Sequence, residues 1–449
     1  MNQPGPLPID DHHVLLSPQL WKRRIALWCG AVLVALAAIL FARASDYAYE
    51  LFKHVLTLSR WWPLLITPIG FVLLAWLTHG AMRSTRGSGI PQVIAAMNRD
   101  EDVPFRDRLV ALPVAAGKLV LTLVAMLVGG SVGREGPTVH VGAGIMAWLA
   151  QRFGYRDPAS ISRFALAGGA AGIAAAFNAP LAGVMFAIEE LASAYEHRFS
   201  GALLTAVMIA GVVSLGLVGN YAYFGQMSIS LPLGQSWFAV LLTGIVGGLA
   251  GGLFASSILR VAGGLPGFLG RFRIAAPASF AAVCGLLLAL IGLASGDTVY
   301  GTGYEEVRAI LAGDSTITVW FGLEKWLANA VSYAAGIPGG IFSPALAVGA
   351  GLGSNLAQLM PGTDPTAVIL LGMSAYLAGV TQAPLTSAVI SMELTNNHNF
   401  VLPIMASCLI GRAFSSVVCK TPVYRAFAAR LVEERKQELE REQQAPAVK

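Results

Sequence analysis

Long apolar runs without a charged residue constrain this chain more than any other feature. Three of them occupy residues 25–41, 203–224 and 238–259. Each is near the ~20 residues that an α-helix needs to cross a bilayer. Only 12% of the 449 residues are charged, whereas a soluble globular domain carries about 25%. The sequence therefore predicts a polytopic membrane protein with helical spans.

The charged residues lie mainly outside these runs. Lys22, Arg23 and Arg24 precede the first run, and basic residues beside a span favour the cytoplasmic side. The run is too long for the ~7–15-residue apolar core of a signal peptide, so we expect it to be retained. The net charge of +5 is therefore interpreted as a signal of membrane orientation rather than of nucleic-acid binding.

The two ends of the chain differ from its centre. Residues 1–20 contain prolines and polar side chains, and residues 429–449 are densely charged, so both are predicted to be tails. Residues 10–13 (DDHH) offer metal-ligand chemistry, but short clusters on tails usually only meet solvent. Four single cysteines are expected to be small buried side chains without a disulfide or metal framework: Cys29, Cys284, Cys408 and Cys419. No cofactor is predicted.

Glycine and proline interrupt several apolar segments. The main breaks are at residues 87–91 (GSGIP), 133–137 (GREGP), 178–180 (NAP) and 336–344 (GIPGGIFSP). Backbone at bilayer depth must satisfy its own hydrogen bonds, so such breaks persist only where protein or a wet cavity replaces lipid. The interrupted helices predict a transport path.

The two halves of the chain resemble each other. A shift of 207 residues aligns residues 137–144 (PTVHVGAG) with 344–351 (PALAVGAG), and a shift of 204 aligns 179–181 (APL) with 383–385 (APL). Two matches in the same order indicate an internal duplication. Repeats with interrupted helices place a substrate site at their interface near mid-membrane. The residues alone leave open whether the second copy is inverted.

In three breaks, glycines in a turn are followed by a proline. Proline is favoured at the start of a helix, so Pro91, Pro137 and Pro344 are predicted to mark helix N-termini. A helix N-terminus offers free N–H groups and about half a positive charge to an anion, and Ser88 adds a hydroxyl donor. The alternative is that these glycines only permit close helix packing. Three such breaks with repeat symmetry favour an anion site.

Glu135 lies inside the second break, where an ionisable residue is costly. A carboxylate at a helix N-terminus can occupy the place of an anion, and protonation removes that attraction. We therefore interpret Glu135 as both a gate and an outer proton acceptor. The alternative, which does not exclude the first, is a capping carboxylate paired with Arg134.

Four other polar residues within apolar segments receive separate interpretations. Glu189 has the repeat counterpart Glu393 and is predicted to be structural, by packing or capping, whereas Glu190 has no acidic counterpart and is free for another task. His140 is expected to be a satisfied buried histidine. Lys118 is expected to snorkel or to balance a buried charge rather than to act as a base.

Four motifs in order resemble those of the CLC family of chloride channels and chloride/proton antiporters. They are residues 87–91 (GSGIP), 133–137 (GREGP), 340–344 (GIFSP) and 420–424 (KTPVY). The resemblance covers about residues 20–428. It implies an all-α homodimer in a bilayer, built from two inverted helical repeats with tilted and interrupted helices. We assign a transport domain to residues 21–428, with repeats at about 21–225 and 235–425.

The resemblance also assigns roles to residues of the breaks. The central anion is expected to be bound by the hydroxyls of Ser88 and Tyr424 and the backbone N–H groups of Ile341 and Phe342. The backbone of Arg134 to Gly136 is expected to line an outer site, which Glu135 occupies when ionised. Glu190 matches the inner proton-transfer glutamate of the family's antiporters.

The sequence therefore predicts a chloride/proton antiporter, with both termini cytoplasmic, in a bacterial inner (plasma) membrane. By the same resemblance, serine at position 88 favours chloride, because the family's nitrate exchangers carry proline there and its fluoride branch carries methionine. Gln92 and Ile94 depart from bacterial relatives that carry acidic residues there, which leaves the surroundings of Lys118 open. The alternative is a passive voltage- or pH-gated chloride channel using the same site. An intramembrane enzyme is disfavoured because the seven histidines lie mainly in tails and loops.

Overall fold

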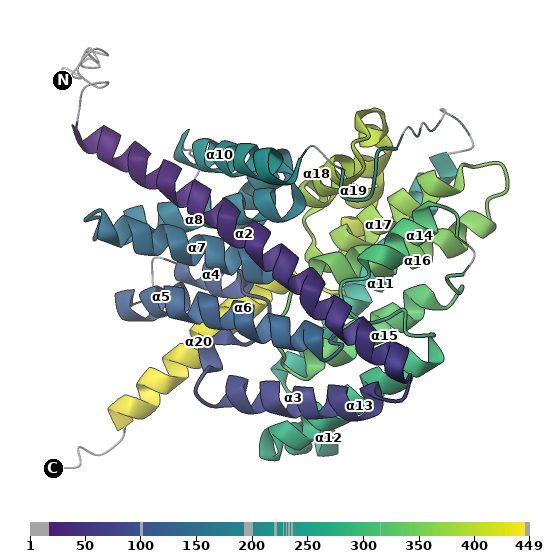
Figure 1. Ribbon diagram of the computed structural model, residues 1–449, viewed down its shortest axis with the longest axis horizontal. Helices are drawn as coiled ribbons and strands as arrows, with labels where there is room; N and C mark the ends of the chain where they lie inside the picture. Colours follow the sequence, from purple (N-terminus) through teal and green to yellow (C-terminus); the bar gives the residue numbers. More distant parts are fainter. Residues whose placement is uncertain are drawn as a thin grey trace.

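The fold is helical (Figure 1). The computed structural model describes residues 18–98, 102–192, 201–219, 222–227, 229, 231, 234, 237–314 and 316–444. Over these residues the secondary structure consists of helices and one isolated β-bridge, which confirms the predicted all-α class. The tail cluster at residues 10–13 lies outside the described residues.

The helices of the first half and those of the second half follow each other along the chain. The first half contains α2(Pro18–Leu58), α3(Pro63–His79), α4(Ile90–Ala96), α5(Val103–Leu109), α6(Leu112–Leu127), α7(Glu135–Arg152), α8(Pro158–Phe177), α9(Pro180–Phe186) and α10(Gly201–Val218). The second half contains α11(Phe238–Gly263), α12(Gly267–Ala275), α13(Pro277–Ala294), α14(Tyr304–Leu311), α15(Phe321–Ala334), α16(Phe342–Gln358), α17(Pro365–Thr381), α18(Pro384–Thr395), α19(Val401–Val418) and α20(Val423–Gln444).

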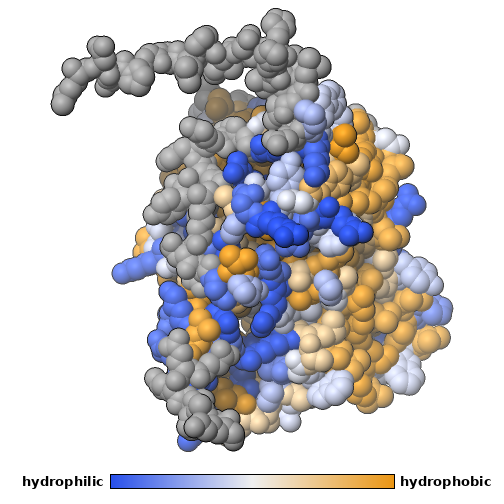
Figure 2. Space-filling view, turned by 90° about the vertical axis from the view of Figure 1, so that its left-hand side faces the viewer, coloured by the Kyte–Doolittle hydropathy of each residue, from blue (hydrophilic) through white to orange (hydrophobic). Residues whose placement is uncertain are grey.

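Among the described residues, seven helical segments are long and apolar enough to cross a membrane. The three predicted runs lie in α2, α10 and α11, although the run 203–224 extends beyond the end of α10 at Val218. Hydrophobic side chains form a broad continuous area on the face shown in Figure 2, as a surface in contact with lipid requires. The chain is a multi-pass membrane protein. Three of the cysteines are buried as predicted, but Cys29 is exposed, so the prediction was wrong for that residue.

In Figure 1, α5, α7 and α8 of the first half lie on the left and α14, α16 and α17 of the second half on the right, while α2 crosses from the upper left to the lower right and α3 lies beside α13. Helix α20 returns from the second half and packs against α4 of the first. It therefore brings the C-terminal motif to the breaks of the first repeat. Helix α20 continues past residue 428, the predicted end of the transport domain, so it includes most of the predicted C-terminal tail.

One β-bridge joins the two repeats at equivalent residues. The Gly133 N–H donates to the Gly340 carbonyl at 2.7 Å, and the Gly340 N–H donates to the Gly133 carbonyl at the same distance. The bridge is antiparallel, and the two residues are 207 positions apart. Equivalent segments that meet in opposite directions are what inverted repeats require.

Some glycines of the repeated VGAG motif serve helix packing. A Cβ atom on Gly142 would lie 2.2 Å from the carbonyl oxygen of Gly168, where α7 crosses α8. A Cβ atom on Gly349 would lie 2.7 Å from the carbonyl oxygen of Gly372, where α16 crosses α17. The packing interpretation therefore holds for these positions, and the same close crossing occurs in both repeats.

Two glutamates exchange helix caps across the repeat interface. The Glu189 carboxylate accepts hydrogen bonds from the N–H groups of Leu385 (3.2 Å) and Thr386 (2.7 Å), in the first turn of α18. The Glu393 carboxylate accepts from Leu181 (3.1 Å) and Ala182 (2.6 Å), in the first turn of α9. The predicted structural role of Glu189 is confirmed as capping of a helix in the other repeat.

Glu189→Gln and Glu393→Gln are each expected to destabilise the protein by about 1–3 kcal/mol, because a half-buried amide would replace a charge-assisted acceptor of helix N–H groups. The measurement is the apparent melting temperature of the purified protein in detergent. Glu434→Gln, in an exposed i,i+4 pair with Arg430, is the matched control and should leave it nearly unchanged. If all three variants had the same melting temperature, the proposed capping by Glu189 and Glu393 would be refuted.

Candidate functional site

Three helices begin at the predicted breaks. Helix α4 begins at Ile90, α7 at Glu135 and α16 at Phe342. The prolines therefore lie in the first turn as predicted, but at the second or third helical position rather than the first. Proline is tolerated there because the N–H groups of the first turn have no intrahelical acceptor.

The breaks converge at Gly136. A Cβ atom on Gly136 would lie 2.2 Å from the Ser88 hydroxyl oxygen and 2.8 Å from the Ser88 carbonyl oxygen. On the other side, a Cβ atom on Gly340 would lie 3.0 Å from the Gly136 nitrogen. Segments more than 200 residues apart thus meet in backbone contact, and only glycine at position 136 permits that approach.

Two buried hydroxyls lie at this junction. Ser88 and Tyr424 are 1% and 0% exposed. Neither hydroxyl oxygen has a well-aligned hydrogen bond in the described part of the chain, although the two side chains lie within reach of each other. The Phe342 ring stacks on the Tyr424 ring, with centroids 5.9 Å apart and planes at 11°. Buried polar groups are normally satisfied, so two hydroxyl donors without a well-aligned bond beside a helix N-terminus can bind a small anion.

Ile341 and Phe342 carry the start of α16 to the same place. Ile341 is the N-cap and Phe342 the first helical residue, and both are 1% exposed. Free N–H groups at this end contribute partial positive charge without a full cation. The structure brings together all the residues that the sequence assigned to the central anion.

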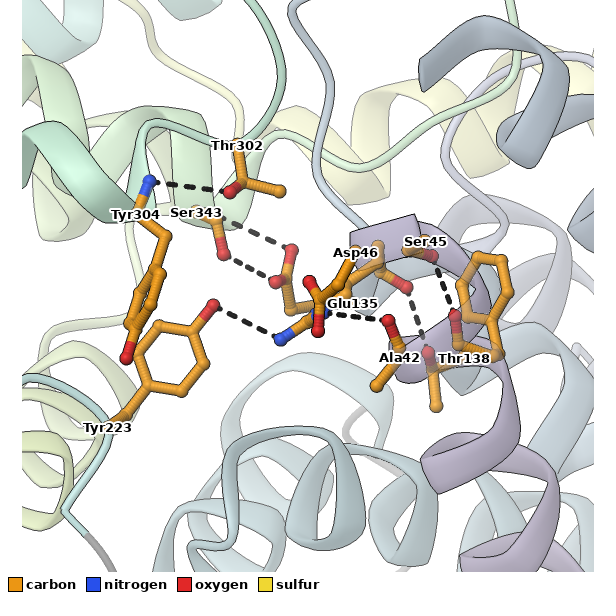
Figure 3. A network of polar contacts seen from close by, with 11 residues as sticks. Ala42, Ser45, Asp46, Glu135, Thr138, Tyr223, Thr302, Tyr304 and Ser343 are labelled. Atoms are coloured by element: carbon orange, nitrogen blue, oxygen red, sulfur yellow. Dashed lines mark hydrogen bonds and ion pairs between the residues drawn. The ribbon is translucent and has the colours of Figure 1, made fainter. Parts of the chain in front are cut away.

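The Glu135 carboxylate lies at the N-terminus of α16 rather than in contact with Arg134. Glu135 is 1% exposed. One carboxylate oxygen accepts a hydrogen bond from the Ser343 hydroxyl, and the other accepts from the Ser343 N–H at 3.5 Å (Figure 3). A carboxylate therefore occupies the position that an anion would take at this helix end. The contact between Ser343 and Glu135 was not predicted, because nothing in the motif indicates which side chain faces the carboxylate.

Arg134 pairs with a residue of α2. Its guanidinium donates to the Asp46 carboxylate at 2.6 Å and to the Ala42 carbonyl at 3.1 Å, and lies over the Tyr223 ring. Figure 3 shows this network beside Glu135. The structure thus directs Arg134 to Asp46 and Glu135 to Ser343, and it gives no support to the alternative in which these neighbours pair with each other. The sequence analysis also missed Asp46, which lies 88 positions away along the chain.

Glu190 lies in a π-helical turn (Ala187–Leu191) that follows α9. It is 3% exposed, and one of its carboxylate oxygens has no hydrogen-bond partner among the described residues. Tyr424 is within electrostatic range of both Glu190 and Glu135. π-helical turns are frequent at functional sites, and this one leaves a buried carboxylate oxygen available for a proton.

The two remaining candidates are buried. His140 bonds the Leu109 carbonyl through Nε2 at 2.6 Å, while Nδ1 has no partner in the described structure, so it is satisfied only in part. Lys118 is 0% exposed and donates to the carbonyls of Arg86 and Gly87; the snorkelling interpretation was wrong. No group of three or more metal-ligating side chains occurs among the described residues.

Comparisons with known proteins agree with this geometry. The sequence profile of the family described as "Voltage gated chloride channel" matches residues 69–416. An "H(+)/Cl(-) exchange transporter ClcA" from Yersinia pestis bv. Antiqua (strain Angola) is 31% identical over 434 residues, covering 90% of this chain and 87% of the relative. A protein of the same name from Citrobacter koseri is 28% identical over 417 residues, covering 88% and 85%.

Solved structures share the fold. A slow cyanobacterial Cl⁻/H⁺ antiporter superposes with a TM-score of 0.80 at 22% identity, covering 94% of this chain and 100% of that one. A CLC-type fluoride/proton antiporter gives 0.77 at 23% identity, covering 91% and 98%. The profile match and the curated relatives together show that this chain belongs to the CLC family of voltage gated chloride channels.

Proposed function

We propose that this protein is a secondary active antiporter that exchanges chloride for protons. The observation that carries the proposal is the Glu135 carboxylate at the N-terminus of α16, bonded to Ser343. A titratable side chain in an anion position provides a direct way to couple the two ions, because the carboxylate and chloride compete for one place. The names of the curated relatives support the same exchange.

Chloride binds, in this proposal, to the hydroxyls of Ser88 and Tyr424 and to the N–H groups of Ile341 and Phe342. Partial charges bind an anion strongly enough to replace its hydration and weakly enough to release it. The backbone of Arg134 to Gly136 lines an outer anion position. When a proton from outside neutralises Glu135, its attraction to the helix end falls and chloride takes its place.

Glu190 completes the proton route on the cytoplasmic side. Its burial and its unpartnered oxygen suit a group that gains and loses a proton without forming a permanent ion pair. A second acidic group beyond the gate favours exchange over passive conduction. The alternative, a chloride channel with Glu135 as a gate only, requires no such group.

We further propose that the protein is a homodimer in a bacterial inner membrane, with both termini in the cytoplasm. Lys22, Arg23 and Arg24 before the first apolar run support that orientation. The transport domain comprises residues 21–428, with repeats at about 21–225 and 235–425, and the tails comprise residues 1–20 and 429–449. Each subunit carries a complete set of site residues, so one anion pathway per subunit is expected.

The test uses purified protein in liposomes with an outward chloride gradient and the membrane potential clamped near zero. External pH and chloride are recorded together in weak buffer. The proposal predicts that chloride efflux drives protons inward against their own gradient. Chloride efflux without any proton movement would make the protein a channel and contradict the proposal.

Ser343→Ala is expected to lower the chloride concentration for half-maximal transport by about tenfold or more. A hydrogen bond to a charged group contributes about 1.5–3 kcal/mol, so Glu135 should compete less well without the hydroxyl. Ser374→Ala is the matched control, since Ser374 is also buried and its hydroxyl donates to the Leu370 carbonyl of its own helix. An effect of Ser343→Ala that persists at full size in a Glu135→Gln background would contradict this account.

A further inference from the structure

Two buried lysines occupy equivalent positions in the repeats. Lys118 on α6 and Lys325 on α15 are 207 positions apart, the same offset that relates the bridged residues Gly133 and Gly340, and both are 0% exposed. The Lys118 ammonium donates to the carbonyls of Arg86 (3.3 Å) and Gly87 (3.1 Å). The Lys325 ammonium donates to three consecutive carbonyls, those of Val299 (2.8 Å), Tyr300 (3.2 Å) and Gly301 (2.9 Å).

The loops that these lysines support are also related. Residues 87–89 (GSG) precede α4, and residues 301–303 (GTG) precede α14. Gly89 and Gly303 both have positive φ, at +108° and +82°. This alignment places Gln92 opposite Glu306 in the first turns of the two short helices.

The charge balance differs between the two copies. Glu306 is buried, and Lys325 interacts electrostatically with it. Gln92 carries no charge; its amide nitrogen donates to the Arg86 carbonyl at 2.7 Å, the same oxygen that Lys118 contacts, and its amide oxygen has no partner among the described residues. Within the described structure Lys118 therefore has no carboxylate comparable to Glu306.

The hydroxyls in the two loops also differ, in whether they are hydrogen-bonded. The Thr302 hydroxyl accepts a hydrogen bond from the Tyr304 N–H at 3.3 Å, whereas the Ser88 hydroxyl forms no well-aligned hydrogen bond in the described part of the chain and has only the Tyr424 hydroxyl within reach. In the second repeat, Glu306 balances the charge of Lys325, and the Thr302 hydroxyl is hydrogen-bonded. In the first repeat, no carboxylate of the described residues balances Lys118, and the Ser88 hydroxyl is available to a ligand. An isolated buried ammonium in a membrane protein is costly, and an anion beside Ser88 reduces that cost.

We propose that the transported anion is the counter-ion of Lys118, and that Gln92 determines anion affinity by remaining neutral. An acidic residue at position 92 would offset the charge of Lys118, as the buried Glu306 offsets that of Lys325 in the other repeat, and would reduce the positive potential at Ser88. This inference rests on the proposed anion site and names the residue that sets the strength of that site.

The test is chloride binding to the purified full-length protein by isothermal titration calorimetry, with chloride-dependent melting as a second measurement. Gln92→Glu is expected to weaken chloride binding about tenfold or more and to reduce the rise in melting temperature that chloride causes. Gln92→Met removes the amide without adding charge and should bind chloride within about threefold of the unmodified protein. Glu306→Gln, the matched change in the other repeat, should also bind chloride within about threefold of the unmodified protein.

Two results would overturn the proposal: Gln92→Glu binding chloride as tightly as the unmodified protein, or Gln92→Met weakening binding as much as Gln92→Glu. A Lys118→Met background adds a direct check, because Gln92→Glu should have little further effect once the ammonium is absent. Melting without chloride shows whether each variant folds. If the unmodified protein binds no chloride, the proposed function fails instead, so the two failures are distinguishable.

Discussion

Glu135→Gln is expected to abolish proton coupling while chloride continues to cross the membrane. Glutamine nearly preserves the size of the side chain at the N-terminus of α16 and can still accept from Ser343. It carries no negative charge to compete with chloride, however, and it cannot bind a proton for transport. Chloride-driven proton movement in liposomes should fall to the level of protein-free vesicles.

Glu305→Gln is the control for this prediction. Glu305 lies on the surface and pairs with Lys53, so its replacement should leave both ion movements intact. Persistent uphill proton movement in Glu135→Gln would contradict the role of Glu135, whatever the rate of chloride transport.

Glu190→Gln is expected to have the second largest effect, a loss of coupled proton movement with chloride movement retained. The carboxylate lies in the π-helical turn, 3% exposed, with one oxygen unpartnered. Its removal should interrupt the proposed inner proton route without altering the groups that we propose bind chloride. The measurement is the ratio of proton to chloride flux in the same liposome assay.

The adjacent residue provides a matched control for Glu190. Glu189 carries the same side chain one position earlier but caps α18. Glu189→Gln should therefore lower stability while the folded protein keeps its flux ratio. A flux ratio that Glu190→Gln leaves unchanged, or that both variants reduce equally, would contradict a specific proton role for Glu190.

The sequence predicted the helical class and the breaks because both depend on local patterns. Uncharged runs of near-span length indicate membrane helices, and glycine–proline pairs indicate helix starts. The repeat offset separated Glu189 from Glu190, since a counterpart in each half indicates a shared structural task. The reciprocal caps of α9 and α18 confirm that interpretation.

Contacts between distant segments were not predictable in this way. The Arg134–Asp46 pair joins α7 to α2, and the bond from Ser343 to Glu135 joins the two repeats. Both depend on how helices cross and on which side chain faces the junction, which no local pattern encodes. Cys29 was mispredicted for a related reason, because its position on α2 faces outward and apolar residues of a membrane protein need not be buried in protein.

The most direct test of coupling is the reversal potential of the purified protein in a planar bilayer, with a fixed chloride gradient and a varied pH gradient. Exchange through Glu135 predicts a reversal potential that lies away from the chloride equilibrium potential and shifts with the pH gradient. It also predicts that Glu135→Gln removes the pH dependence. A reversal potential that equals the chloride equilibrium potential at every pH gradient would contradict the account and identify a passive channel.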